Sequence, residues 1–77
     1  MKIKKFSIFD SFRPLLESER VVEARNRKEA VAKEYNVNMK AVRANSRGHL
    51  LVTEIELKDN QLYRRGRTIG YEVVNRV

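Results

Sequence analysis

The sequence contains no cysteine, and this absence excludes two classes of small protein. Without cysteine there is neither a disulfide scaffold nor a metal site built on thiolates. The single histidine, His49, also excludes a zinc site that needs a histidine pair. A chain of 77 residues without such cross-links is typical of a reducing compartment, so we expect a cytoplasmic protein without a metal or a cofactor.

Long hydrophobic runs are also missing from the chain. No apolar stretch approaches the ~18 to 20 residues that a membrane-spanning helix requires. Residues 1–10 combine lysines with an apolar stretch that is too short and too polar for the core of a signal peptide. The chain has only three glycines and one proline, so no flexible linker divides it. We therefore expect a single soluble, basic domain over residues 1–77.

Negative charge is in the minority. The chain has 17 Lys and Arg residues against 10 Asp and Glu residues, which gives a formal net charge of +7. The basic segments are residues 1–9, 25–47 and 60–77, and they alternate with acidic segments at residues 10–24 and 48–59. Such a charge balance favours binding to a polyanion, and nucleic acid is the ligand class that we predict.

Two segments in the first third of the chain alternate apolar with polar side chains, which predicts two strands. These segments are residues 4–10 and residues 20–25. Their inward-facing side chains are expected to be Phe6, Ile8, Val22 and Ala24. Between the two strands, residues 10–14 are turn-forming, and a short helical turn through Leu15 and Leu16 is expected to follow.

The second half of the chain predicts a hairpin and a last strand. The hairpin consists of residues 50–57, a turn at residues 58–61 and a return strand at residues 62–65. Gly66 then marks a bulge or a bend. The side chains expected to share the inward faces are Leu51, Ile55 and Leu57 in the first strand and Ile69, Tyr71 and Val73 in the last strand.

The clearest local signal is a helix start at Asn26. The Asn26 side chain can accept a hydrogen bond from the amide of Glu29, and the Glu29 carboxylate can reach back to the amide of Asn26. This capping box predicts a helix over residues 27–35, and Asn36 suits the left-handed conformation that ends a helix. The buried side of this helix is expected to comprise Ala30, Val31, Tyr35 and the aliphatic part of Glu34.

Residues 37–46 decide between two folds. If they form a strand, the order is strand, strand, helix, strand, strand, strand, and the fold class is α+β with one main helix packed on a small antiparallel sheet. We favour this fold, because the two strands before residue 26 have no place in a minimal winged helix. If residues 39–46 instead form a second helix, the fold is a winged helix-turn-helix.

Residues 28–46 resemble a helix-turn-helix motif. The matching positions are Ala32 at the helix crossing, Asn36 and Val37 in the turn, and Val42 on the inner side of the second helix. Asn45 departs from the motif, because an aliphatic residue is normally buried at its position. The resemblance implies DNA binding through the second helix, with the hairpin as the wing.

Arginines of the predicted hairpin form the first candidate binding site. Arg64, Arg65 and Arg67 surround Gly66, and guanidinium groups have a fork geometry that suits phosphate. Tyr63, beside them, offers a ring on which a base can stack. The alternative interpretation is a solvated hairpin in which these arginines pair with acidic residues on other strands, namely Glu54, Glu56 and Glu72.

A second group of candidate residues lies at the predicted helix and after it. This group comprises Arg27, Lys28, Lys40, Arg43 and Arg47. If residues 39–46 are helical, the last three are spaced by three and four positions and form one stripe that would face a nucleic-acid groove. If the same residues form a strand, the stripe breaks up and only the hairpin arginines support the function.

Catalytic groups are scarce. Glu54 and Glu56 are two positions apart, but solvated positions on the outer side of a strand explain them better than a catalytic or cation-binding pair. We therefore predict a nucleic-acid-binding accessory protein that is not an enzyme, with DNA preferred over RNA because of the helix-turn-helix alternative. The other hypothesis is a non-catalytic protein-binding module, such as a virus-encoded inhibitor or adaptor that docks on an acidic partner.

Overall fold

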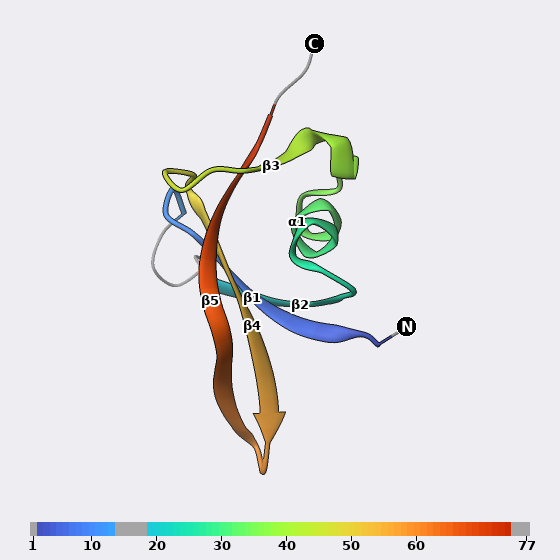
Figure 1. The fold of residues 1–77 in the computed structure, drawn as a ribbon, viewed down its shortest axis with the longest axis vertical. Coiled ribbons are helices and arrows are strands. Elements are labelled where there is room, and N and C mark those ends of the chain that lie inside the picture. The colour runs from blue at the N-terminus through green and yellow to red at the C-terminus, as the bar shows by residue number, and fades with distance from the viewer. Residues whose placement is uncertain (1, 14–18, 75–77) are drawn as a thin grey trace.

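The computed structural model describes residues 2–13 and 19–74 (Figure 1). The elements are β1 (Lys4–Asp10), β2 (Glu19–Ala24), α1 (Arg27–Tyr35), the 3₁₀ turn η2 (Met39–Ala41), β3 (Val42–Ala44), β4 (Leu50–Lys58) and β5 (Gln61–Val73). One α-helix with an antiparallel sheet confirms the predicted α+β class. The predicted helical turn through Leu15 and Leu16 lies outside the described residues.

The five strands form one sheet in the order β2-β1-β4-β5-β3, and every neighbouring pair is antiparallel. Helix α1 packs on one face of this sheet, which we call the covered face; Figure 1 shows the helix on that side, above β2. No described helix packs on the opposite face, which we call the open face. Successive residues of each strand point alternately to these two faces.

The hydrophobic core lies between α1 and the covered face. Its largest fully buried side chains are Phe6, Ile8, Val31, Leu50 and Val52. Full burial of a side chain of this size stabilises the fold by about 1.5–3 kcal/mol. Ala24 of β2 and Ala30 of α1 are also completely buried, so small side chains allow the helix to approach the sheet closely.

The inward side of β4 differs from the prediction by one residue. Leu50 and Val52 are fully buried beneath α1, whereas Leu51 and Leu57 are 38% and 48% exposed on the open face. Alternation alone could not identify the buried side, because the run from Leu50 to Val52 is apolar at every position. Ile55 is buried as predicted, at 3% exposure, although by alternation it belongs to the open face.

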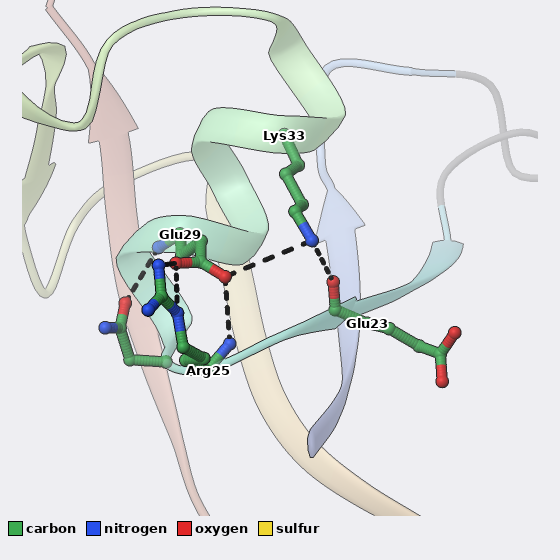
Figure 2. Close-up of polar contacts among 5 residues, drawn as sticks. Glu23, Arg25, Glu29 and Lys33 are labelled. Carbon is green, nitrogen blue, oxygen red and sulfur yellow. Dashed lines mark hydrogen bonds and ion pairs between the residues drawn. The ribbon is translucent and has the colours of Figure 1, made fainter. Parts of the chain in front are cut away.

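Both predicted ends of α1 are confirmed, with one change in the capping box. Asn26 Oδ1 accepts a hydrogen bond from the amide of Glu29 at 2.8 Å. The Glu29 carboxylate contacts Arg25 instead of Asn26, and it accepts hydrogen bonds from the Arg25 amide and Nε at 3.1 Å each (Figure 2). Asn36 ends the helix with φ 53° and ψ 50°, and its amide donates to two carbonyls of the last turn.

Residues 39–46 do not form the second helix of the winged alternative. Asn38 caps a single 3₁₀ turn, in which its Oδ1 accepts a hydrogen bond from the amide of Lys40 at 2.9 Å. The chain then enters β3, where Val42 lies opposite Val73 of β5 and is only 2% exposed. Pairing with β5 and burial of Val42 under α1 together favour a strand over a helix at this place.

The tip of the β4–β5 hairpin and its bulge agree with the predicted turn and bend. Asp59 and Asn60 have φ values of 52° and 62°, and two consecutive positive values are typical of a type I′ turn. Gly66 has a φ of 86° and lies where the register between β4 and β5 shifts, between Thr53 and Glu54. Glycine adopts this left-handed conformation without a steric penalty.

The hairpin extends beyond the rest of the sheet. β1 pairs with β4 only as far as the register of Lys5 with Ile55. Residues 56–63 therefore form a two-stranded ribbon, which extends away from the body at the lower end of Figure 1. All side chains of this ribbon are exposed.

Candidate nucleic-acid interface

The three hairpin arginines do not form one cluster. Arg64 is in register with Ile55 and lies on the open face, whereas Arg65 is in register with Glu54 on the covered face. Arg67 lies in the bulge. Because successive strand residues point to opposite faces, neighbouring guanidinium groups are divided between the two sides of the hairpin.

Only one of these arginines makes an ion pair with a described residue. Arg65 Nη1 lies 3.3 Å from Glu56 Oε2. Arg64 and Arg67 have no such partner in residues 2–13 and 19–74. Tyr63 is 47% exposed, so its ring is accessible for stacking. The interpretation in which all three arginines pair with glutamates therefore applies to Arg65 alone.

Arg27 connects the first turn of α1 to the bulge of β5. Its Nη2 donates a hydrogen bond to the carbonyl of Arg67 at 2.9 Å, and its guanidinium lies 5.9 Å from the centre of the Phe6 ring. The Nε of Arg27 is buried and has no hydrogen-bond partner among the described residues. This hydrogen bond links the first turn of α1 to the bulge that contains Arg67.

An open groove of about 320 Å³ lies between the start of α1 and the covered face, and we call it the basic groove. Its cations are Lys4, Arg25, Arg27 and Lys28, and its other lining residues include Phe6, Met39, Glu54 and Tyr71. The cations come from β1, from the segment between β2 and α1, and from α1 itself. Positive charge from separate parts of the chain therefore converges beside two aromatic rings.

Ion pairs neutralise part of the charge in this groove. Lys4 Nζ lies 3.7 Å from Glu54 Oε1, and Arg25 Nη2 lies 3.0 Å from Glu29 Oε2. The hydrogen bond from the Arg25 amide, with that from the Arg25 side chain, lowers the pKa of Glu29 (Figure 2). Lys28 has no ion pair within the described residues. The carboxylates of Glu54 and Glu29 are only 23% and 14% exposed, so a phosphate in this groove has to compete with them for Lys4 and Arg25.

The predicted stripe of Lys40, Arg43 and Arg47 is not present. Arg43 lies on β3, where its Nη2 is 3.2 Å from Glu72 Oε1. Lys40 lies in η2, and Arg47 lies in the segment between β3 and β4, so the three cations belong to different elements. Hydrogen bonds from Asn45 and Arg43 lower the pKa of Glu72. Arg43 is therefore part of a local polar network on the open face, away from the basic groove.

The candidate carboxylate pair is separated by its ion pairs. Glu54 lies beside Lys4 and Glu56 beside Arg65. In residues 2–13 and 19–74 no group of three or more His, Cys, Asp or Glu side chains is arranged to bind a metal ion. In these ranges no helix is long and apolar enough to span a bilayer. The groove offers positive charge that suits a phosphate, whereas its two aromatic rings, Phe6 and Tyr71, are buried at 1% and 8% exposure.

Lys4 belongs to the basic groove, although it was not among the predicted site residues. It lies two positions before Phe6 on β1, and strand alternation places both side chains on the covered face. The pattern that predicted Phe6 inward thus contained the signal for Lys4. The position of Lys4 near the start of α1 could not be predicted from the sequence, because it depends on how the helix crosses the sheet.

Comparisons with protein-family models, curated proteins and solved structures found no match for this chain. Its function is therefore inferred from the geometry of the basic groove, the hairpin and the open face.

Proposed function

We propose that this protein binds nucleic acid without catalysing a reaction, through phosphate contacts in the basic groove and along the adjoining hairpin. The supporting observation is the convergence of Lys4, Arg27 and Lys28 in one groove, where Arg27 also ties α1 to the bulge that contains Arg67. The chain has a net charge of +7, and a DNA duplex presents one negative charge per about 1.7 Å of its axis. The long-range attraction between the basic chain and the nucleic acid and the local contacts in the groove therefore both favour binding.

Duplex DNA is the preferred ligand, for a reason different from the predicted one. The second helix is absent from residues 39–46, but residues 56–63 form a two-stranded ribbon, and the major groove of B-DNA admits such a ribbon. The major groove of A-form RNA is too narrow and deep for side chains to read. Tyr63 and Arg65 lie on the side of the hairpin that faces the same way as the basic groove.

The test measures binding to a short duplex at several salt concentrations. We expect the double variant Lys28→Gln/Arg67→Gln to bind every duplex sequence more weakly, with a salt slope lower by about 0.9 for each phosphate that is no longer neutralised. Arg43→Gln/Arg47→Gln is the matched control, because it removes the same charge outside the basic groove. Its salt slope should remain close to that of the parent protein.

Two results would contradict this proposal in different ways. Equal weakening in the two double variants would show that net charge, and not the basic groove, determines binding. A parent protein without salt-sensitive binding to duplex DNA, single-stranded DNA or structured RNA would eliminate the nucleic-acid function. The hypothesis of a protein-binding module that docks on an acidic partner would then be preferred.

A further inference from the structure

Four of the large apolar side chains that remain exposed among the described residues lie on the open face. They are Val21, Leu51, Leu57 and Leu62, with exposed fractions between 38% and 52%. Of the other exposed residues of this class, Met39 and Tyr63 lie on the helix side, and Phe12, which is 80% exposed, lies in the turn after β1 with its ring stacked on that of His49. Leu57 and Leu62 are in register on the ribbon, and a row that contains Glu23, Lys5 and Arg64 separates them from Val21 and Leu51, so this face carries two apolar groups that can contact a partner.

The polar side chains at the centre of the open face are already buried and hydrogen-bonded within one copy of the chain. Ser7 and Thr53 are each 3% exposed there, and both hydroxyls already have partners. Ser7 donates to a Glu19 carboxylate oxygen, and the Thr53 and Thr68 hydroxyls are 2.7 Å apart. A partner that covers this region would therefore leave no buried hydroxyl without a hydrogen bond.

The charges of the open face are balanced, in contrast to those of the whole chain. One row across the sheet consists of Glu23, Lys5, Ile55 and Arg64 on four neighbouring strands. Glu19 lies on β2 with Glu23, so acidic side chains occupy one edge of this face while Arg64 lies on β5 at the other side. Two copies with a net charge of +7 each repel one another least through such a surface.

We propose that two copies of this chain associate through their open faces as a symmetric sandwich of two sheets. A two-fold axis parallel to the strands, between β1 and β4, lays β2 of each copy over β5 of the other. Glu23 then faces Arg64 of the second copy, and the contact occurs twice. In the same arrangement Leu51 packs against Phe9 of the second copy, because Leu51 and Phe9 are in register within one sheet.

This association places the two basic grooves on opposite outer sides of the dimer. Each groove remains accessible, since α1 and the first turn of the helix lie on the covered face. The inference does not depend on the proposed function, because it concerns the other face of the sheet. Its test uses the protein without nucleic acid.

The test is sedimentation equilibrium of the full chain over a wide range of protein concentration. The mass should rise from that of the 9.1 kDa monomer to twice this value. We expect Leu51→Glu to raise the dissociation constant at least tenfold, because it places two carboxylates in the apolar interface. Val21→Glu, on the edge strand and 52% exposed, should act in the same direction and provides a second variant if the first folds poorly.

Met39→Glu is the matched control, since Met39 is 41% exposed on the helix side and receives the same change of charge. It should leave the dissociation constant unchanged. Equal weakening by Met39→Glu and Leu51→Glu would overturn the assignment of the interface to the open face. If the parent chain is monomeric at every concentration, the proposed dimer is wrong. A different protein would then be the expected partner of this face.

Charge reversal tests the pairing across the axis. Glu23→Arg and Arg64→Glu should each weaken the dimer several-fold, and the double variant should recover most of the original affinity. Failure of the double variant to recover would contradict the proposed two-fold arrangement, because the two side chains would then not face one another.

Discussion

The two faces of the sheet differ both in what covers them and in their composition. Leu50 and Leu51 are adjacent on β4, yet Leu50 is completely buried under α1 while Leu51 is 38% exposed on the open face. The covered face is mostly apolar, whereas the open face mixes apolar side chains with polar ones such as Ser7, Thr53 and Arg64. The difference between the two leucines shows that the burial of an apolar side chain depends on where α1 packs.

The largest expected effect compares these two neighbouring leucines. Leu50→Ala should reduce the free energy of unfolding by about 2–5 kcal/mol, because it leaves a cavity beneath α1. Leu51→Ala should reduce it by less than about 1 kcal/mol when the chain is dilute enough to be monomeric. Urea denaturation of both variants measures the difference. Similar reductions at the two positions would mean that the open face is already covered within one copy of the chain.

An intermediate effect is expected at the helix cap, which positions the basic groove. Asn26→Ala removes the acceptor for the Glu29 amide and should cost about 0.5–2 kcal/mol. Asn26→Ser keeps an acceptor and is the conservative control. A denaturation midpoint that Asn26→Ala leaves unchanged would show that the cap contributes nothing to α1, and a lower stability of Asn26→Ser would point to a role other than capping.

The smallest expected effect is a pH dependence that the two faces share. The pKa values of Glu29 on the helix side and Glu72 on the open face are both lowered from an ordinary value of 4.5, by hydrogen bonds from Arg25 and from Asn45 with Arg43. A lowered pKa in the folded state stabilises the fold above the ordinary value, and this contribution is lost as the pH falls through the lowered value.

Each of Glu29→Gln and Glu72→Gln should therefore flatten the decrease of stability on the acid side. Thermal denaturation from neutral pH into the acid range below pH 4.5 is the measurement, since the stabilisation is lost as the pH falls from the ordinary pKa through the lowered one. A parent protein and two variants with the same acid profile would contradict the ion-pair and hydrogen-bond assignments on both faces.

Local chemistry made the helix and the hairpin predictable. Asn26 and Asn36 define the two ends of α1 through side-chain capping and a left-handed backbone, and both effects depend only on neighbouring residues. The Asp59–Asn60 turn and the Gly66 bulge are local in the same sense. By contrast, residues 39–46 are suited to a helix or a strand, and pairing of Val42 with the distant Val73 decided between them.

The candidate site was predictable only in part. The alternation that placed Arg64 and Arg65 in a strand also separates them onto opposite faces, a consequence that follows from strand geometry alone. The meeting of Arg27 with the bulge at Arg67 could not be predicted, because the two residues are far apart in the sequence and meet only where α1 crosses the sheet.

The sequence by itself determined the basic charge, the ends of α1, the turn and bulge of the hairpin, and the alternation of each strand. These properties arise from residue composition and from interactions within a few positions. The tertiary structure alone decided which side of β4 is buried, the strand at Val42–Ala44 and the convergence of Lys4 with Lys28 in one groove. Each of these depends on the placement of α1 across the sheet, where burial of apolar side chains selects one arrangement among several that local preferences allow equally.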